Sequence, residues 1–262
     1  MCGIFGFILK KPLSMKKVFD ILKRLESSRY LDEEQPVGGY GAGVAVMLPD
    51  GDIISEKVGK SAGSPVAQLA DLMKPGLKNA QVLIGHVRFP SPQNMGTVRY
   101  KEAAQPYVEH FEPQLTIVSS HNGNVENYKE LKSQLKTHVF ESEKVGLIDS
   151  EVIPHYFGEM INEIESTDDA VYNLLCALKG SSAAALLQVD EENAFIHLIH
   201  KGKARGLIVW TNESGEMIFC SRREPVEAEL KERLAVGLFK EKIIINWKEE
   251  AGLKLSFPVI FQ

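Results

Sequence analysis

The second residue of the chain is a cysteine, and this position permits chemistry that an internal cysteine cannot perform. Methionine aminopeptidase tolerates small second residues, so removal of Met1 would leave Cys2 with both a thiol and a free α-amino group. The thiolate is the nucleophilic form of cysteine, and a free thiol has a pKa of about 8.5. An α-amine with a pKa of roughly 7.7–8.0 can accept the thiol proton near neutral pH. Cys2 could therefore act as nucleophile and base together, although its position alone indicates catalysis only weakly.

Four short segments, the first of which contains Cys2, carry side chains that suit the hydrolysis of an amide. They are Met1-Cys2-Gly3-Ile4-Phe5-Gly6, Gly85-His86-Val87-Arg88-Phe89, His121-Asn122-Gly123 followed by Glu126-Asn127-Tyr128, and Ile148-Asp149-Ser150-Glu151-Val152-Ile153. In this order and at this spacing, they resemble the motifs of class II glutamine amidotransferases, which are N-terminal nucleophile hydrolases. The resemblance covers about residues 1–190 well, whereas residues 200–262 fit it only loosely.

The resemblance implies a role for several of these side chains. Attack of a thiolate on an amide passes through a tetrahedral oxyanion that needs prepositioned donors, and the implied donors are the Asn122 side chain and the Gly123 backbone N–H. Arg88 can hold a carboxylate through two parallel N–H bonds, and Asp149 can hold an ammonium group, which together match free glutamine. Taken singly, Asn-Gly more often marks a tight turn, Arg88 would be a surface residue after a strand, and Asp149 a helix cap.

The segment after Arg88 departs from the family pattern, which is an aromatic, a small residue and threonine within a lid over the site. The order here is Phe89-Pro90-Ser91-Pro92, in which Phe89 keeps the aromatic and Ser91 can replace the threonine hydroxyl. Two prolines fix φ and should stiffen the segment. We therefore expect Phe89 and Ser91 to contact the substrate, with less lid motion or a different trigger for closure.

The branch of the family stays open. Residues 104–107 resemble the glutamate synthase branch, whereas residues 126–131 resemble the glucosamine-phosphate synthase branch.

The elements that must position these residues follow from the periodicity of apolar residues. Helical spacing predicts helices that begin at Ser14, that span 128–135 and 152–164, and that run from Asp168 or Asp169 to Gly180. Pro49-Asp50-Gly51 predicts a hairpin turn, and the polar stretch 27–41 predicts a loop. Short apolar runs predict strands at 3–9, 43–48, 53–57, 82–87, 115–119, 183–189, 195–199, 206–211, 217–221 and 243–247.

This order of elements is typical of sheets that pack together and are covered by helices. The resemblance implies an α+β fold, a four-layer αββα sandwich with two antiparallel sheets between helical layers. The chain of 262 residues is expected to form a single domain over 1–262.

Composition argues against several other classes of protein. The net charge of −5 disfavours a nucleic-acid interface, and no apolar run is long enough to span a membrane. Three widely separated cysteines without a CxxC pair predict free thiols in a reducing, cytoplasmic setting. His197 and His200 lie three apart in a predicted strand and face opposite sides, so a shared metal is not expected. No cofactor is expected either.

The function implied by the resemblance is that of a glutaminase subunit, which hydrolyses glutamine to glutamate and ammonia through a Cys2 thioester. No P-loop-like or pyrophosphate-binding motif is present, and only about 60 residues follow the strands after the third predicted helix, too few for a synthase domain. A separate synthase subunit is therefore expected to accept the ammonia. Two alternatives stay open. One is hydrolysis of another γ-glutamyl amide, and the other is a low-turnover subunit that senses glutamine or acts as a scaffold, which the stiff lid motivates.

Overall fold

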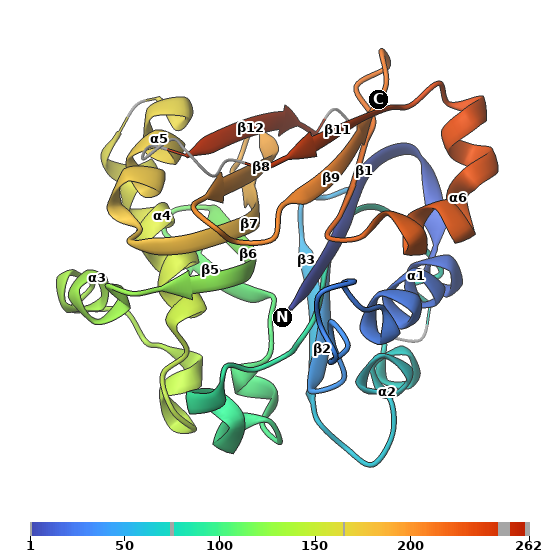
Figure 1. Ribbon diagram of the computed structural model, residues 1–262. Helices are drawn as coiled ribbons and strands as arrows, with labels where there is room; N and C mark the ends of the chain where they lie inside the picture. Colours follow the sequence, from blue (N-terminus) through green and yellow to red (C-terminus); the bar gives the residue numbers. More distant parts are fainter. Residues whose placement is uncertain (1, 74–75, 165, 246–251, 260–262) are drawn as a thin grey trace.

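Two antiparallel β-sheets form the centre of the molecule in the computed structural model, which describes residues 2–73, 76–164, 166–245 and 252–259 (Figure 1). The seven-stranded sheet has the order β11 (Lys240–Ile244), β9 (Leu207–Thr211), β10 (Met217–Cys220), β1 (Gly3–Ser14), β4 (Asn79–Val87), β2 (Gly41–Met47) and β3 (Ile53–Gly59). The five-stranded sheet has the order β12 (Leu253–Pro258), β8 (Ala194–Lys201), β7 (Gly180–Val189), β6 (Leu115–Val125) and β5 (Tyr107–Phe111).

Helices cover the outer face of each sheet. The helices on the seven-stranded sheet are α1 (Met15–Ser27), α2 (Pro65–Leu72) and α6 (Arg223–Val236), and those on the five-stranded sheet are α3 (Tyr128–Gln134), α4 (Val152–Glu163) and α5 (Thr167–Ala177). Four 3-10 turns lie between elements: η1 (Pro92–Thr97), η2 (Lys101–Ala103), η3 (Glu141–Lys144) and η4 (Asp149–Glu151). The predicted fold class, an α+β sandwich with two antiparallel sheets between helical layers, is confirmed.

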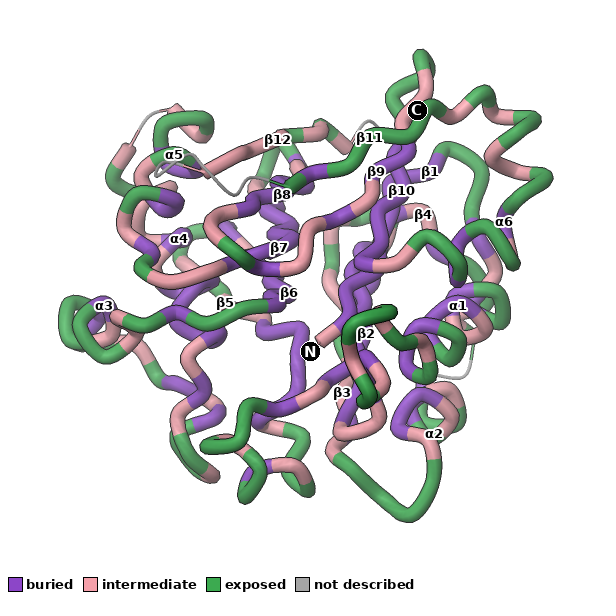
Figure 2. Tube along the Cα trace, viewed as in Figure 1, coloured by how far each residue is buried: buried purple, intermediate pink, exposed green. Residues whose placement is uncertain are grey.

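The first strand shows why its apolar run is continuous rather than alternating. Ile4 and Ile8 belong to the core between the two sheets, whereas Phe5 and Phe7 belong to the core beneath α1. Successive side chains of a strand point to opposite faces, and here both faces are covered. Figure 2 shows the same burial along the central strands of both sheets, with the outer turns of the helices exposed.

The elements predicted from the sequence are largely present. Ser14 caps α1, since its Oγ accepts a hydrogen bond from Lys17 N at 3.3 Å, and β2 pairs with β3 as an antiparallel hairpin. The strand predicted at 3–9 is longer, because β1 continues to Ser14. The strand predicted at 243–247 is found as Lys240–Ile244, and its residues 246 and 247 lie outside the described residues.

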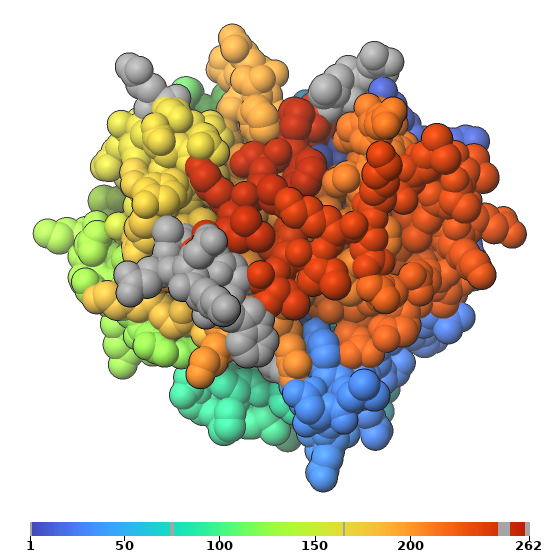
Figure 3. Space-filling model, turned by 45° about the horizontal axis from the view of Figure 1, so that its top comes forward, coloured from blue at the N-terminus to red at the C-terminus, as the bar shows by residue number. Residues whose placement is uncertain are grey.

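The C-terminal part of the chain, which fits the family resemblance only loosely, contributes to both sheets. It supplies β9, β10 and β11 to the seven-stranded sheet and β12 to the five-stranded sheet. In Figure 3 this part, coloured orange to red, covers much of the face in view. Within the described residues, no helix is long and apolar enough to cross a membrane.

The buried His197 of β8 gives the fold a predictable response to acid. Its ring nitrogens lie 2.9 Å from Ser256 Oγ and 3.2 Å from Gln188 Oε1, and burial lowers the pKa of His197 from 6.5 to about 4. The unfolded chain therefore binds a proton at His197 more readily than the folded chain does. The contribution of His197 to stability is complete above pH 6.5 and is lost as the pH falls from 6.5 to 4.

We expect the free energy of unfolding to fall by up to about 3 kcal/mol between pH 6.5 and 4 because of His197. Urea titrations at pH 7 and pH 4.5 should show a smaller loss in His197→Gln than in the original chain. The exposed His110 of β5 offers the control His110→Gln, which should leave the loss unchanged. An equal acid sensitivity of all three proteins would contradict the assignment.

Candidate functional site

Cys2 lies at the entrance to β1, and its sulfur contacts the backbone of the residue that follows Arg88. Sγ lies 3.3 Å from the Phe89 carbonyl oxygen, and the Phe89 N–H donates to Sγ at 3.4 Å. β1 pairs with β4 in the register Gly3 to Val87, which brings the first and second sequence motifs together. The thiol is thereby fixed by main-chain atoms on its neighbouring strand.

A cavity of about 280 Å³ opens beside this sulfur. Its walls include six of the seven residues predicted from the sequence, and these are Cys2, Arg88, Phe89, Ser91, Gly123 and Asp149. The seventh, Asn122, is buried and is not among the residues that line the cavity. Four motifs separated by up to about 150 positions therefore meet at one cavity.

Arg88 directly follows β4, and Thr97 holds its guanidinium group. Its Nη2 donates to Thr97 Oγ1 at 2.7 Å and its Nη1 to the Thr97 carbonyl oxygen at 3.3 Å. Only 4% of Arg88 is exposed, and burial lowers the pKa of its guanidinium. Arginine nevertheless remains charged in proteins, so Arg88 places a fixed positive charge at the cavity.

Asp149 lies in η4, within the fourth sequence motif, and is anchored to the end of β6. Its Oδ2 accepts a hydrogen bond from the Val125 N–H at 2.8 Å. A carboxylate has about four acceptor positions, so this one bond leaves Asp149 with capacity for a cationic group in the cavity.

The Asn122-Gly123 pair lies inside β6, whereas the sequence placed it after the strand and before a helix. β6 runs to Val125, and Gly123 is paired with Ser182 of β7. The φ of Gly123 is 150°, and a Cβ there would lie 2.0 Å from the Ser181 carbonyl oxygen. Glycine is therefore required by the close approach of β7 and by the backbone conformation.

The side chain of Asn122 has an unusual hydrogen-bonding state. Its Nδ2 is buried and has no hydrogen-bond partner among the described residues. A buried donor without a partner costs about 1–3 kcal/mol, and such groups in native proteins often have a functional reason. An amide N–H kept without a partner beside Gly123 is suited to a transient negative charge.

The two histidines of the motifs have different environments. His121 is hydrogen-bonded locally, with Nδ1 at 2.8 Å from Ser150 Oγ and Nε2 at 3.1 Å from Ser182 Oγ. His86 is fully buried, neither ring nitrogen makes a hydrogen bond of normal geometry, and burial lowers its pKa to about 3. A histidine with this pKa is neutral near pH 7 and does not serve as a base there.

The thiol of Cys2 needs a proton acceptor other than His86. Burial raises its pKa above the ordinary 9.0, an effect that the hydrogen bond from Phe89 opposes. The other two cysteines lie away from the cavity. Cys176 is exposed, and Cys220 is buried with a pKa raised to about 12 by burial.

Two residues that support the site were not singled out from the sequence. Thr97 holds the Arg88 guanidinium, and Gln105 bonds both sides of the His121 backbone, accepting from its N–H at 2.6 Å and donating to its carbonyl at 3.1 Å. Gln105 thereby fixes the part of β6 that carries Asn122. In the sequence, residues 104–107 indicate only a resemblance to one family branch.

A family profile described as a glutamine amidotransferase domain matches residues 93–228, which is just over half of the chain. The chain belongs to this family. It is a class II glutamine amidotransferase domain, as its sequence motifs indicated. The matched range contains Asn122, Gly123 and Asp149, whereas Cys2 and Arg88 precede it.

Curated relatives of this amidotransferase domain include enzymes named glutamine–fructose-6-phosphate aminotransferase (isomerizing). The one from Thermococcus kodakarensis is 31% identical over 98% of the chain and 42% of the relative. The one from Bacillus thuringiensis subsp. konkukian is 29% identical over 94% of the chain and 37% of the relative. The chain thus spans less than half the length of the curated relatives it matches.

Solved structures with the same fold include glutamine phosphoribosylpyrophosphate amidotransferase from B. subtilis, with a TM-score of 0.62 and 19% identity, covering 100% of this chain and 50% of that one. A second structure, described as the allosteric regulatory enzyme of purine biosynthesis, has a TM-score of 0.64 at 19% identity, also covering 100% of this chain and 50% of that one. This amidotransferase domain therefore has the fold of N-terminal nucleophile hydrolases.

Proposed function

We propose that the chain, after loss of Met1, hydrolyses the side-chain amide of glutamine to glutamate and ammonia, with all of 1–262 acting as one glutaminase domain. The observation that carries the proposal is the convergence of Cys2, Arg88, Gly123 and Asp149 on one cavity of about 280 Å³. A thiol, a cation and an anion around a small cavity match the amide, the carboxylate and the ammonium group of one free amino acid.

The reaction begins with transfer of the Cys2 thiol proton to its own α-amine. Sγ then forms a bond to the amide carbon of glutamine, and the negative charge moves to the carbonyl oxygen. The C–N bond breaks, the amine returns its proton to the nitrogen, and ammonia leaves. Water then attacks the glutamyl thioester, and glutamate and the free thiol are released.

The oxyanion of this reaction lies between two donors in the proposed mechanism. These donors are Nδ2 of Asn122, which has no other partner, and the backbone N–H of Gly123, which lines the cavity. Donors that are fixed before the charge develops need no reorganisation, and one of them typically contributes a factor of about 10²–10³ to kcat. The Phe89 N–H, which donates to Sγ at 3.4 Å, holds the attacking thiolate in place.

Substrate recognition is assigned to Arg88 for the carboxylate and Asp149 for the ammonium group, with Phe89 and Ser91 on the wall between them and the solvent. The Phe89 ring packs edge-on against Tyr40 at 5.1 Å, and Thr97 ties the end of η1 back to Arg88. These contacts support a stiff cover over the substrate, formed by residues 89–97.

Replacing Arg88 by alanine should raise KM for glutamine strongly while kcat changes little. The carboxylate loses a charge-assisted pair of hydrogen bonds, each worth about 1.5–3 kcal/mol because one partner is charged, so kcat/KM should fall by about 10²–10⁴. Initial-rate measurements of ammonia release over a range of glutamine concentrations give both constants.

The matched variant Arg88→Lys keeps the charge but not the two-pronged geometry, and it should recover only part of the affinity. Thr97→Val, which removes the hydroxyl that positions Arg88, should raise KM by a smaller factor. A KM for Arg88→Ala within about threefold of the original, at unchanged folding, would remove Arg88 from the substrate site.

The fate of the ammonia is a separate part of the proposal. We infer that it passes to an acceptor bound by a separate synthase subunit, because a glutaminase with an acceptor avoids losing ammonia to solvent. The names of the curated relatives include a sugar-phosphate acceptor, and the similarity spans less than half of their length. Copurification from native cells with mass identification tests this inference, which fails if the chain isolates alone and releases all its ammonia freely.

The choice of substrate is tested by comparing glutamine with other γ-glutamyl amides. We expect one glutamate and one ammonia to be released per glutamine consumed. The kcat/KM for glutamine should exceed that for N-substituted γ-glutamyl amides. A preference for the substituted amides would identify a different γ-glutamyl hydrolase. Tight glutamine binding without ammonia release would identify a sensing or scaffolding subunit.

A further inference from the structure

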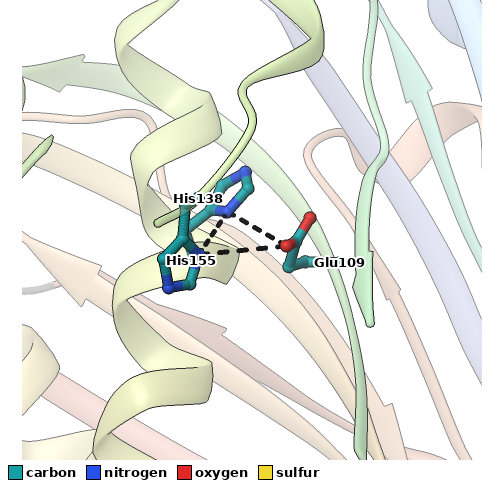
Figure 4. Close-up of side chains that lie close together, drawn as sticks. All are labelled: Glu109, His138 and His155. Atoms are coloured by element: carbon teal, nitrogen blue, oxygen red, sulfur yellow. Dashed lines mark hydrogen bonds and ion pairs between the residues drawn. The ribbon is translucent and has the colours of Figure 1, made fainter. Parts of the chain in front are cut away.

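A second group of side chains with metal-binding chemistry lies outside the glutamine cavity, on the five-stranded sheet (Figure 4). It consists of Glu109 from β5, His138 from the segment after α3, and His155 from α4, and we call it the two-histidine cluster. Three segments that are distant in sequence each contribute one side chain. The cluster has no part in the proposed glutaminase chemistry.

The three donor atoms of the cluster converge on one point. Nδ1 of His138 lies 2.9 Å from Nδ1 of His155, and Oε1 of Glu109 lies 3.4 Å from His155 Nδ1 and 3.8 Å from His138 Nδ1. A triangle with these sides has a point about 2.0 Å from all three atoms, which is the length of a Zn–N or Zn–O bond. We propose that the two-histidine cluster binds a zinc-type divalent ion, with water as the fourth ligand.

The outer nitrogens of both imidazoles face carboxylates. His138 Nε2 lies 2.7 Å from Glu159 Oε1, and His155 Nε2 lies 4.0 Å from Glu151 Oε1. At His138 the Glu159 carboxylate holds the proton on Nε2, which leaves the Nδ1 lone pair for a metal, whereas the 4.0 Å at His155 is an ion-pair distance and no hydrogen bond. Metal-ligating histidines almost always have such a partner on the other ring nitrogen.

The charge around the cluster also favours a cation. Glu109, Glu151 and Glu159 surround the two rings, and among the described residues no lysine or arginine forms an ion pair with any of the three. The site therefore attracts positive charge, as either a proton or a metal ion.

Aromatic walls fix the rings and limit access of water. Phe140 stacks on His155 with ring centres 4.1 Å apart, and Phe111 packs against His138 at 5.6 Å. The histidine side chains are 7% and 3% exposed, whereas Glu109 is 24% exposed. One edge therefore stays open at Glu109, which gives an ion its entry path and its water ligand.

An ion at the cluster would join β5, α4 and the segment after α3. Glu151, beside His155, is the last residue of η4, and Asp149 at the start of η4 lines the glutamine cavity. The ion would therefore brace the wall that carries Asp149 without touching the substrate. We assign it a structural role.

Zinc titration of the full chain tests the proposal. Cys2→Ser is the background, because a free N-terminal cysteine chelates zinc on its own, and this choice makes the result independent of glutamine hydrolysis. After treatment with a chelator, the protein is titrated with Zn²⁺ against a chromophoric competitor. We expect one saturable equivalent, together with a Zn²⁺-dependent rise in Tm.

Ligand variants give the decisive comparison. His138→Asn and Glu109→Gln should weaken Zn²⁺ binding by more than about 100-fold, and Glu159→Gln, which removes the partner of His138, should weaken it by about 10–100-fold. His110→Ala is the matched control, since His110 is an exposed histidine of the same strand that bonds only Thr116. It should bind as the background does.

Two results would overturn the proposal. One is the absence of a saturable equivalent in the background protein, in which case a proton satisfies the cluster. The other is equal Zn²⁺ affinity in His138→Asn, Glu109→Gln and the background, which would place the bound ion elsewhere. Circular dichroism at the titration temperature establishes that each variant is folded, and the half-exposed Glu159 provides a variant that leaves the core unaltered.

Discussion

Replacing Cys2 with alanine should abolish ammonia release from glutamine. The sulfur that forms the thioester is lost, and no other thiol lines the cavity among the described residues. Removal of a catalytic nucleophile typically costs a factor of about 10⁴ or more in kcat, so activity should fall to the background of the assay. Coupled detection of ammonia and of glutamate measures the loss from both products.

The control for this variant is Cys176→Ala, which removes an exposed thiol on α5 and should retain full activity. Glutamine should still bind to Cys2→Ala, because Arg88 and Asp149 are unchanged, and calorimetry can measure that binding. Turnover by Cys2→Ala within about tenfold of the original would mean that another group attacks the amide.

The variant Asn122→Ala should lower kcat by about 10²–10³ with little change in KM, because the lost donor acts only on the oxyanion. Its Nδ2 has no partner among the described residues, so loss of this nitrogen sacrifices no hydrogen bond of the free protein. The free energy of unfolding should therefore stay nearly constant or rise, since burying an unpaired donor costs about 1–3 kcal/mol. Steady-state kinetics and urea unfolding measure the two effects.

The comparison for Asn122 is Asn124, the exposed asparagine two residues along β6 that lines the same cavity. Asn124→Ala should lower kcat by less than about tenfold, because the proposed oxyanion site does not include it. Equal losses of kcat in the two variants would show that the amide of Asn122 has no special part in catalysis.

The chemistry of the site was readable from the sequence because four short motifs each carry a reactive, charged or hydrogen-bonding residue in the order typical of the family. Cys2, Arg88, Gly123 and Asp149 meet at one cavity, as expected if the motifs share a site. The exact placement of Asn122-Gly123 was not readable. Four polar residues, 119–122, follow Val118 and end the apolar run, and pairing with β7 keeps them in strand conformation.

The fold class was implied by the family resemblance and agreed with the order of the predicted elements, whereas β5, β12 and α6 were not predicted. β5 and β12 are edge strands with polar residues and flanking prolines, so they lack the apolar run of a central strand. α6 buries only Pro225, Val226 and Leu230 of its fourteen residues, which leaves no apolar face to detect. Such elements depend on tertiary contacts that local patterns do not encode.

The residues that support function through tertiary contacts could not be predicted from the sequence either. Thr97 holds Arg88 from nine positions away, across two prolines. The two-histidine cluster combines residues 109, 138 and 155 without the short spacing of known metal motifs. His197 and His200, by contrast, stand out in the sequence as a candidate pair because they lie only three residues apart.

The most direct test of the account is the covalent intermediate on the mature chain. The protein is mixed with glutamine, quenched in acid within the first turnover, and analysed by intact and fragment mass spectrometry. We predict a chain that begins at Cys2 and carries the mass of one glutamyl group on that residue, absent from Cys2→Ala. A chain that retains Met1 yet releases ammonia at full rate, or a glutamyl group on any other residue, would contradict the central claim.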